Sequence, residues 1–287
     1  MKKLLAILMA LVLALAFVAC GEKEAATGDD TVVSGDLAKI KEAGVIKIGM
    51  ECDYAPFNWT QTNASDYAEP IAVGGYADGY DVQIAKKIAE GLGVKVEIVK
   101  TGWEGLIPAL QAGEIDGIIA GMSPTEERKA TIDFTDNYYE SQLVVVMKKD
   151  SPFASATSIH EFAGAKITGQ LNTFHETVIE QMDGVDKQVS METFPAMIVA
   201  LQSGVIDGYI SERPGAVSAV AANPDLTFVE FSEGNGFVAS PDDVAIAVGI
   251  RKGSDLADSV NEILAGISND DRQALMDEVV ARQPVTE

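Results

Sequence analysis

The alternation of apolar and polar positions contains one pattern twice. Residues 109–119 read ALQAGEIDGII, and residues 200–210 read ALQSGVIDGYI. In each copy an apolar helical face ends at a glycine, which adopts a left-handed conformation at little cost, and a short apolar strand follows. A helix–turn–strand unit that occurs twice predicts two similar lobes, and 287 residues are enough for each lobe to bury its own core.

Periodicity elsewhere in the chain predicts further helices and strands. The predicted helices are 36–44, 80–91, 103–112, 173–182, 194–203, 254–267 and 270–281. The predicted strands are 45–50, 94–99, 115–120, 143–147, a segment around Ile167, 205–210 and 244–250. Because strands alternate with helices, we expect a parallel-type sheet in each lobe. The polar, glycine-containing segment 61–78 is expected to be a loop or a hairpin.

The chain is expected to cross between the lobes twice. An apolar, β-branched strand begins at Leu143, soon after the polar segment 136–139, which favours a first crossing there. The last two helices are expected to return to the first lobe. We therefore predict that lobe 1 comprises residues 37–141 and 242–287 and that lobe 2 comprises residues 142–241. Two crossings would form a hinge.

The N-terminal residues have the pattern of an export signal. Lys2 and Lys3 precede an unbroken apolar run from residue 4 to residue 19, which is short for a membrane span. We therefore expect residues 1–19 to be a signal peptide. Residues 20–36 are small, acidic and rich in glycine, which predicts a flexible linker.

The end of this apolar run resembles the lipobox of bacterial lipoproteins. Residues 17–20 read FVAC, with Phe17 where the lipobox usually has leucine. The resemblance implies that Cys20 is lipid-modified and becomes the mature N-terminus. It further implies an exported protein anchored on the outer face of the cytoplasmic membrane, in the periplasm or at the cell surface. Cleavage without lipidation is the alternative.

Composition narrows the range of partners. The formal net charge is −23, so nucleic acid is not an expected partner. With Cys20 lipid-modified, Cys52 is left alone and no internal disulfide can form; we expect Cys52 to be a buried packing residue. The sequence contains no metal-ligand cluster, phosphate-binding glycine loop or ATP motif, so we expect neither a metal nor a cofactor. We also expect a monomer.

Polar side chains follow both strands of the repeat. Gly121, Ser123 and Arg128 follow the first copy, and Ser211 and Glu212 end the second. In open α/β sheets, ligands collect beyond the carboxyl ends of the strands. A guanidinium on one lobe that faces a carboxylate on the other would suit a zwitterionic ligand.

Several motifs occur in the order typical of one family. They are YAPF (54–57), GYDV (79–82), GEID (113–116), GMSPTEER (121–128) and GYISE (208–212). With this ordered set, the chain from about Leu37 onward resembles the polar amino-acid solute-binding proteins of bacterial ABC importers. The resemblance implies an α/β, two-lobed periplasmic-binding-protein fold of type II, with the ligand cleft between the lobes. It also implies delivery of an amino acid to a membrane permease that works with a separate ATPase.

The resemblance assigns roles at the backbone-like end of the ligand. Arg128 matches the arginine that binds the ligand α-carboxylate, because a guanidinium is a planar fork that fits two oxygens. Gly121 and Ser123 match positions that bind the same end of the ligand. Glu212 matches the acid that receives the α-ammonium from lobe 2. Without the motif, Arg128 would be a surface arginine paired with a neighbouring glutamate, and Glu212 a solvated carboxylate.

A second-lobe loop is expected to meet the same carboxylate. Gln170, Thr173 and Phe174 match family positions at which backbone amides of a helix start face the anion. The family usually has glycine where this chain has Asn172, and asparagine tolerates positive φ better than most residues.

The ligand side chain is expected to lie between aromatic rings. Tyr54 and Trp103 match the positions that sandwich it, although core packing would also explain both rings. Glu51 matches the position at which receptors for basic amino acids carry an acid. The resemblance therefore implies a ligand of the arginine, lysine or histidine type, with a neutral polar amino acid such as glutamine as the alternative. Asp53 is expected to be solvated.

Other functions are known for chains of this type. The chain also resembles a few exported enzymes, notably cyclohexadienyl dehydratases, and the sensor modules of kinases. The two histidines, His160 and His175, form no nucleophile–base pattern, so we expect no catalytic residues. Both are expected to be structural or surface residues, with a place in the cleft as the alternative for His175. A dehydratase that uses Glu212 or Glu51 is the enzymatic alternative.

Overall fold

The computed structural model describes residues 35–283. The predicted signal peptide, the lipidation site Cys20 and nearly all of the linker lie outside the described residues. None of the helices between residues 35 and 283 has the length and apolar character that a membrane crossing requires.

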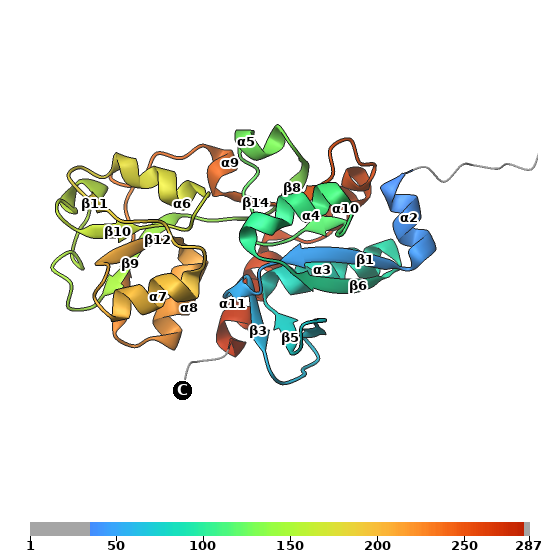
Figure 1. Cartoon of the computed structure of the whole chain (residues 1–287), viewed down its shortest axis with the longest axis horizontal. Coiled ribbons are helices and arrows are strands. Elements are labelled where there is room, and N and C mark those ends of the chain that lie inside the picture. Colours follow the sequence, from blue (N-terminus) through green and yellow to red (C-terminus); the bar gives the residue numbers. More distant parts are fainter. Residues whose placement is uncertain (1–34, 284–287) are drawn as a thin grey trace, which may run out of the picture. The chain divides into compact units, whose positions relative to one another are not determined.

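Two five-stranded sheets, one in each lobe, carry the fold (Figure 1). Their orders are β6-β1-β7-β14-β8 and β11-β10-β12-β9-β13. The first sheet consists of β1 (Val45–Met50), β6 (Lys95–Lys100), β7 (Gly117–Ile118), β8 (Asp133–Glu140) and β14 (Ala245–Ile250). The second consists of β9 (Leu143–Lys148), β10 (Lys166–Thr168), β11 (Asp186–Lys187), β12 (Gly208–Glu212) and β13 (Leu226–Val229).

Both sheets are mixed, so the prediction of parallel sheets is only partly right. β6, β1 and β7 are parallel, as are β11, β10 and β12. The remaining strands pair antiparallel: β14 with β7 and β8, and β9 with β12 and β13. Parallel neighbours need a crossover connection within one sheet. β9 and β14 instead enter their sheets from the other lobe, without such a connection.

The repeat occupies equivalent places in the two sheets. α4 (Leu106–Ala112) precedes β7, and α7 (Phe194–Gln202) precedes β12. β7 and β12 each have a parallel neighbour on one side and an antiparallel neighbour on the other. The chain leaves the first sheet after β8, enters the second at β9 two residues later, and returns to the first at β14.

The other elements complete the lobes around these sheets. A small antiparallel sheet, β2-β3-β5-β4, contains β2 (Asp53–Tyr54), β3 (Asn58–Gln61), β4 (Glu69–Pro70) and β5 (Tyr76–Asp78), so the segment 61–78 is a hairpin. The longer helices are α2 (Asp36–Ala43), α3 (Tyr80–Leu92), α8 (Arg213–Ala222), α10 (Leu256–Ala265) and α11 (Asn269–Arg282). The shorter ones are η1 (Trp103–Gly105), α5 (Glu126–Lys129), η2 (Ile159–Glu161), α6 (Phe174–Thr177), η3 (Val178–Gln181) and α9 (Pro241–Val244).

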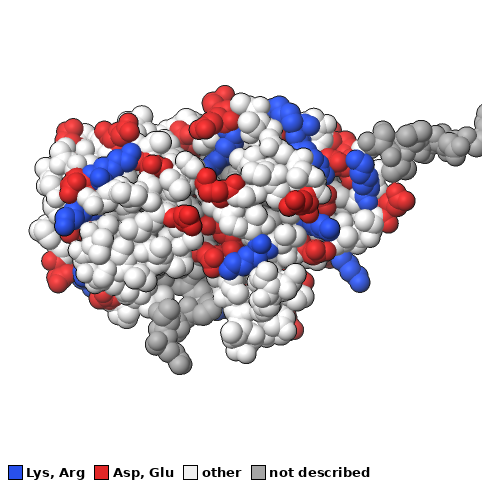
Figure 2. Space-filling view, viewed as in Figure 1, with Lys and Arg blue, Asp and Glu red and all other residues white. Residues whose placement is uncertain are grey.

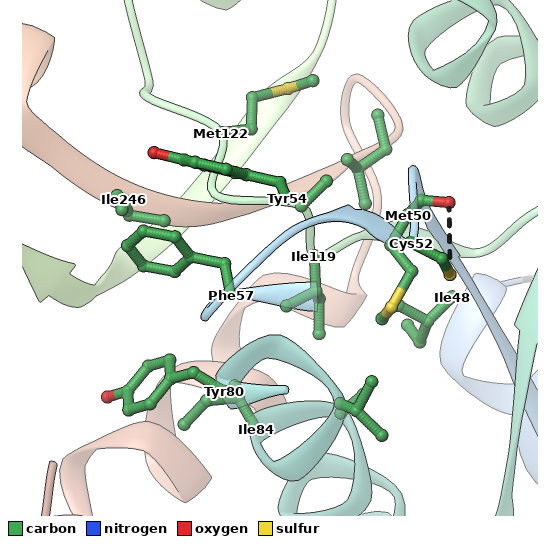
Figure 3. Packing of buried hydrophobic residues seen from close by; sticks show 14 of the residues in the cluster. Ile48, Met50, Cys52, Tyr54, Phe57, Tyr80, Ile84, Ile119, Met122 and Ile246 are labelled. Atoms are coloured by element: carbon green, nitrogen blue, oxygen red, sulfur yellow. Dashed lines mark hydrogen bonds between the residues drawn. The ribbon is translucent and has the colours of Figure 1, made fainter. Parts of the chain in front are cut away.

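The core of lobe 1 lies between the first sheet and α3. Tyr80 and Ile84 of this helix face Phe57 and the strands (Figure 3), and the rings of Phe57 and Tyr80 meet edge to face with centroids 6.4 Å apart. Cys52 is fully buried in the same cluster, which confirms its predicted packing role, and burial raises the pKa of its thiol to about 12. Its thiol is therefore protonated and unreactive at neutral pH.

Charged side chains of both signs share the surface. On the face seen in Figure 2, Lys and Arg are interspersed with Asp and Glu.

Gly79 connects β5 of the small sheet to α3 in a backbone conformation that only glycine adopts readily. It has φ 132°, a conformation open essentially only to glycine, and a Cβ there would overlap the carbonyl of Phe57. We expect Gly79→Ala to lower the free energy of unfolding by about 3 kcal/mol or more. Gly93→Ala, at the other end of the helix, is the control. Its φ is 71° and its Cβ would meet nothing, so about 1 kcal/mol is expected. Urea denaturation measures both, and equal losses would contradict this account.

Candidate functional site

The predicted site residues converge where strand ends of the two lobes meet. Glu51 directly follows β1, Gly121 and Ser123 follow β7, Gln170 follows β10, and Glu212 ends β12. A cavity of about 20 Å³ is lined by every predicted ligand-binding residue except Glu51. Glu51 joins the group through Gln170 and lines an adjacent cavity of about 290 Å³. The structure therefore brings the predicted residues together.

Arg128 is held so that its charge faces the cleft. It lies in the short helix α5, whose N-cap Thr125 accepts its backbone N–H. Nη1 donates to the carbonyl of Ser123 at 3.0 Å, and Nη2 donates to the carbonyl of Asn172 in lobe 2 at 3.2 Å. Its guanidinium carbon lies 5.0 Å from the centroid of the Trp103 ring. Burial lowers the pKa of Arg128 to about 10, so it stays protonated at neutral pH.

These contacts differ from those of a surface ion pair. Within residues 35–283, the hydrogen-bond partners of the guanidinium are carbonyl oxygens rather than the neighbouring Glu126 or Glu127. The positive charge is therefore oriented but not neutralised by a direct carboxylate contact, which favours an anionic partner.

Glu212 is a buried carboxylate with two partners. His175 Nε2 lies 2.9 Å from Oε1, and the hydroxyl of Tyr54, from lobe 1, donates to Oε2. Burial alone would raise the pKa of Glu212, but its interaction with His175 and the hydrogen bond from Tyr54 outweigh burial and hold the pKa below its ordinary value. Glu212 is therefore ionised at neutral pH.

His175 lies in the cleft, which was the alternative expectation for this residue. It was expected to be structural or on the surface, yet it lines the same cavity as Glu212 and is 6% exposed. Its ring meets Phe194 edge to face, and Phe194 stacks on Tyr54 with centroids 4.1 Å apart. Phe194 was likewise identified only as part of a helix. Neither contact has a sequence signal: the first depends on how α6 and α7 pack within lobe 2, and the second on how β2 meets lobe 2.

Glu51 lies apart from Glu212 and has the opposite pKa shift. It is 4% exposed, and both of its oxygens accept hydrogen bonds from Gln170 Nε2, at 3.3 and 3.2 Å. Burial raises the pKa of Glu51 to about 7, although the bond from Gln170 opposes this shift. Asp53 lines the same cavity as Glu51, but its side chain is partly solvated, as expected, and pairs with Lys100 at 3.1 Å.

The lobe 2 loop departs from its predicted form in one respect. Thr173 Oγ1 donates to the carbonyl of Gln170 at 2.7 Å, and Asn172 has φ 56°, which agrees with the expectation that asparagine replaces a glycine there. However, the predicted helix 173–182 is only a four-residue α-helix, α6, followed by η3. Such a short helix contributes individual N–H groups rather than a large dipole.

Gly121 and Ser123 are held by contacts within lobe 1. Gly121 has φ 61°, and a Cβ there would lie 2.9 Å from the ring of Tyr54, so the close approach of this ring requires glycine. Ser123 Oγ donates to the carbonyl of Asp243 at 3.0 Å. Among residues 35–283, no group of His, Cys, Asp and Glu side chains is arranged to hold a metal ion.

The sequence agrees with one protein family over most of its length. The family model of the bacterial extracellular solute-binding proteins, family 3, matches residues 46–278. The chain belongs to this family. Membership confirms the predicted resemblance, and the predicted two-lobed fold is confirmed by the solved structures that are similar to it.

Relatives of this family 3 solute-binding protein include amino-acid receptors. The arginine-binding extracellular protein ArtP of Bacillus subtilis is 28% identical over 271 residues, covering 92% of both chains. A probable histidine-binding protein of Campylobacter jejuni is 30% identical over 194 residues, covering 67% of this chain and 70% of its own. A crystal structure of an amino acid ABC transporter substrate-binding protein from Streptococcus pneumoniae, bound to L-arginine, has a TM-score of 0.74 at 27% identity and covers 86% of this chain and 98% of its own.

Proposed function

We propose that this family 3 solute-binding protein binds an L-amino acid with a basic side chain between its lobes and delivers it to an ABC permease. One observation carries the proposal: Arg128 from lobe 1 and Glu212 from lobe 2 line the same small cavity. These are the opposite charges that the carboxylate and the ammonium group of an amino acid require.

The groups around Arg128 suit the carboxylate end of the ligand. The guanidinium keeps donors for two oxygens, and Gly121, Ser123 and Thr173 line the same cavity. On the opposite side, Glu212 would accept the α-ammonium on Oε2, where the hydroxyl of Tyr54 now donates. Oε1 would keep its contact with His175.

The groups around Glu51 suit a cationic side chain. The second cavity, of about 290 Å³, is lined by Trp103 and by the acidic residues Glu51, Asp53, Glu104 and Glu192, together with Lys100, which pairs with Asp53. An aliphatic stem could pack on Trp103 while its charged tip pairs with Glu51. The similarity to arginine- and histidine-binding proteins supports the same ligand class.

Ligand entry would require the lobes to move. The central cavity of about 20 Å³ is far below the roughly 300 Å³ of a small ligand pocket. Inter-lobe contacts, such as those from Tyr54 to Glu212 and from Gln170 to Glu51, span this space. A hinge at the two crossings would let the lobes separate and then close on the ligand.

A neutral polar amino acid is the second candidate ligand. Glu51 already accepts an amide N–H from Gln170, so the amide of a ligand such as glutamine could take the same place. We infer a receptor rather than an enzyme, although a carboxyl group with a pKa near neutrality could act as a general acid. Conversion of prephenate or arogenate by the purified protein would contradict the receptor assignment.

Arg128→Ala tests the carboxylate site. A ligand at 100 times its dissociation constant should raise the free energy of unfolding of the wild type by about 2.7 kcal/mol. We expect the variant to fold, because Arg128 is half-buried, but to lose this stabilisation with every common amino acid. Lys129→Ala is the control, since the neighbouring Lys129 pairs with Asp242 away from the cavity. A thermal-shift screen followed by calorimetry measures both variants, and wild-type affinity in Arg128→Ala would refute the assignment.

Glu51→Gln tests the side-chain site through its pH dependence. Below its pKa of about 7 the carboxyl group of Glu51 is neutral and no longer attracts a cation. The affinity for arginine should therefore fall relative to that for glutamine, by up to about tenfold per unit, as the pH falls from about 8 to about 6. In Glu51→Gln this ratio should be low and independent of pH. Calorimetry at each pH gives the ratio, and an unchanged ratio in the variant would exclude a cationic tip at Glu51.

Cys20→Ser tests the proposed lipid anchor. Because the thiol carries the lipid, we expect the wild type in a bacterial host to incorporate labelled palmitate and to sediment with membranes. The variant should do neither. A wild-type protein that is secreted without lipid would contradict the anchor and leave the ligand site unaffected.

A further inference from the structure

The motif GYDV places a carboxylate in the interior of lobe 1, away from the ligand cavity. Asp81 lies in the first turn of α3 and is 0% exposed. Burial raises the pKa of Asp81 to about 6, against the opposing effects of Tyr138, Asn58 and the backbone N–H of Gly121. Its two oxygens accept hydrogen bonds from two different side chains. Each of these side chains also accepts a backbone N–H from a different segment of the site.

One oxygen of Asp81 orients the turn that carries Glu51. Asn58 Nδ2 donates to Asp81 Oδ2 at 2.8 Å, and Asn58 Oδ1 accepts the backbone N–H of Cys52 at 2.7 Å. A carboxylate only accepts hydrogen bonds, so the Asn58 amide must turn its nitrogen to Asp81 and its oxygen to Cys52. Cys52 has φ 59°, a strained conformation for a residue with a Cβ. It directly follows Glu51, so this contact holds the turn that aims Glu51.

The other oxygen of Asp81 orients the segment that carries Gly121. The Tyr138 hydroxyl donates to Asp81 Oδ1 at 2.7 Å, which leaves its oxygen free to accept the backbone N–H of Gly121 at 3.3 Å. Gly121 is itself in a left-handed conformation, with φ 61°. Tyr138 is fully buried and stacks near Tyr80, with ring centroids 6.1 Å apart, so its hydroxyl has one position.

We propose that Asp81 is a positioning residue that fixes both ligand-binding segments of lobe 1, one through Asn58 and one through Tyr138. We call the contacts from Asp81 through Asn58 to Cys52 the Asn58 arm, and those through Tyr138 to Gly121 the Tyr138 arm. If the proposed function holds, the two arms act on different ends of the ligand. The Asn58 arm controls the side-chain end through Glu51, and the Tyr138 arm controls the carboxylate end through Gly121.

Ligand selectivity separates positioning from a general contribution to stability. Tyr138→Phe keeps the ring and removes the hydroxyl, so we expect arginine and glutamine to bind about tenfold more weakly, both to the same degree. Asn58→Ser releases the turn after Glu51, so we expect arginine to lose about tenfold more affinity than glutamine. Trp59→Phe is the control, because Trp59 is a buried neighbour on β3 outside both arms. It should lower the melting temperature and leave both affinities unchanged.

Hydrogen exchange tests the two arms without any ligand. We expect Asp81→Asn, whose amide can accept from only one of the two donors, to speed exchange of the Cys52 or the Gly121 amide about tenfold, as measured by NMR. Trp59→Phe should not produce this local effect. The proposal would be overturned if both amides of Asp81→Asn exchanged at the wild-type rate. Unchanged affinities in Tyr138→Phe and Asn58→Ser would also overturn it. If exchange changes as expected but the wild type binds no amino acid, the proposed function fails and the positioning role stands.

Discussion

The guanidinium of Arg128 and the carboxylate of Glu212 belong to different lobes, and the rest of the architecture serves to bring them to one cavity. Glu212 ends β12, and Arg128 lies in α5, the helix that follows β7; these two strands occupy equivalent places in their sheets. Within the described part of the chain, Arg128 is hydrogen-bonded to carbonyl groups, so its positive charge is not neutralised by a hydrogen-bonded carboxylate. Glu212 stays ionised because His175 and Tyr54 compensate for its burial.

Two acidic side chains of the site differ because their neighbours differ. Glu212 is bonded to an imidazole and a phenol, and its pKa is lowered, whereas Glu51 is bonded to the neutral amide of Gln170, and its pKa is raised to about 7. Burial acts in the same direction on both carboxyl groups. The different partners therefore give the two carboxyl groups different charge states. Glu212 is ionised at neutral pH, whereas Glu51 is only partly ionised and would become fully ionised beside a cationic partner.

The cleft depends on a polar layer beneath it. Asp81 accepts hydrogen bonds from Asn58 and Tyr138, and these in turn accept the backbone N–H groups of Cys52 and Gly121. Both of these residues have positive φ. Strain of this kind persists only where the surroundings determine the conformation. A buried acid at the start of α3 therefore connects the core of lobe 1 to the surface that faces lobe 2.

Local pattern was sufficient for many of the elements and for much of the site, but it did not predict β8, α8 or β13. The repeat indicated α4–β7 and α7–β12, and the ordered motifs selected Arg128 and Glu212, because both signals lie within short segments of chain. Glu51 lies outside these motifs and was selected as a position that matches the family. The tertiary structure alone decided the antiparallel places of β9 and β14, the contact of His175 with Glu212 and the stacking of Tyr54 on Phe194. Periodicity reports which face of an element is buried but not which distant residue covers it. Those partners are set only when the elements of each lobe pack together and the two lobes and their crossings assemble.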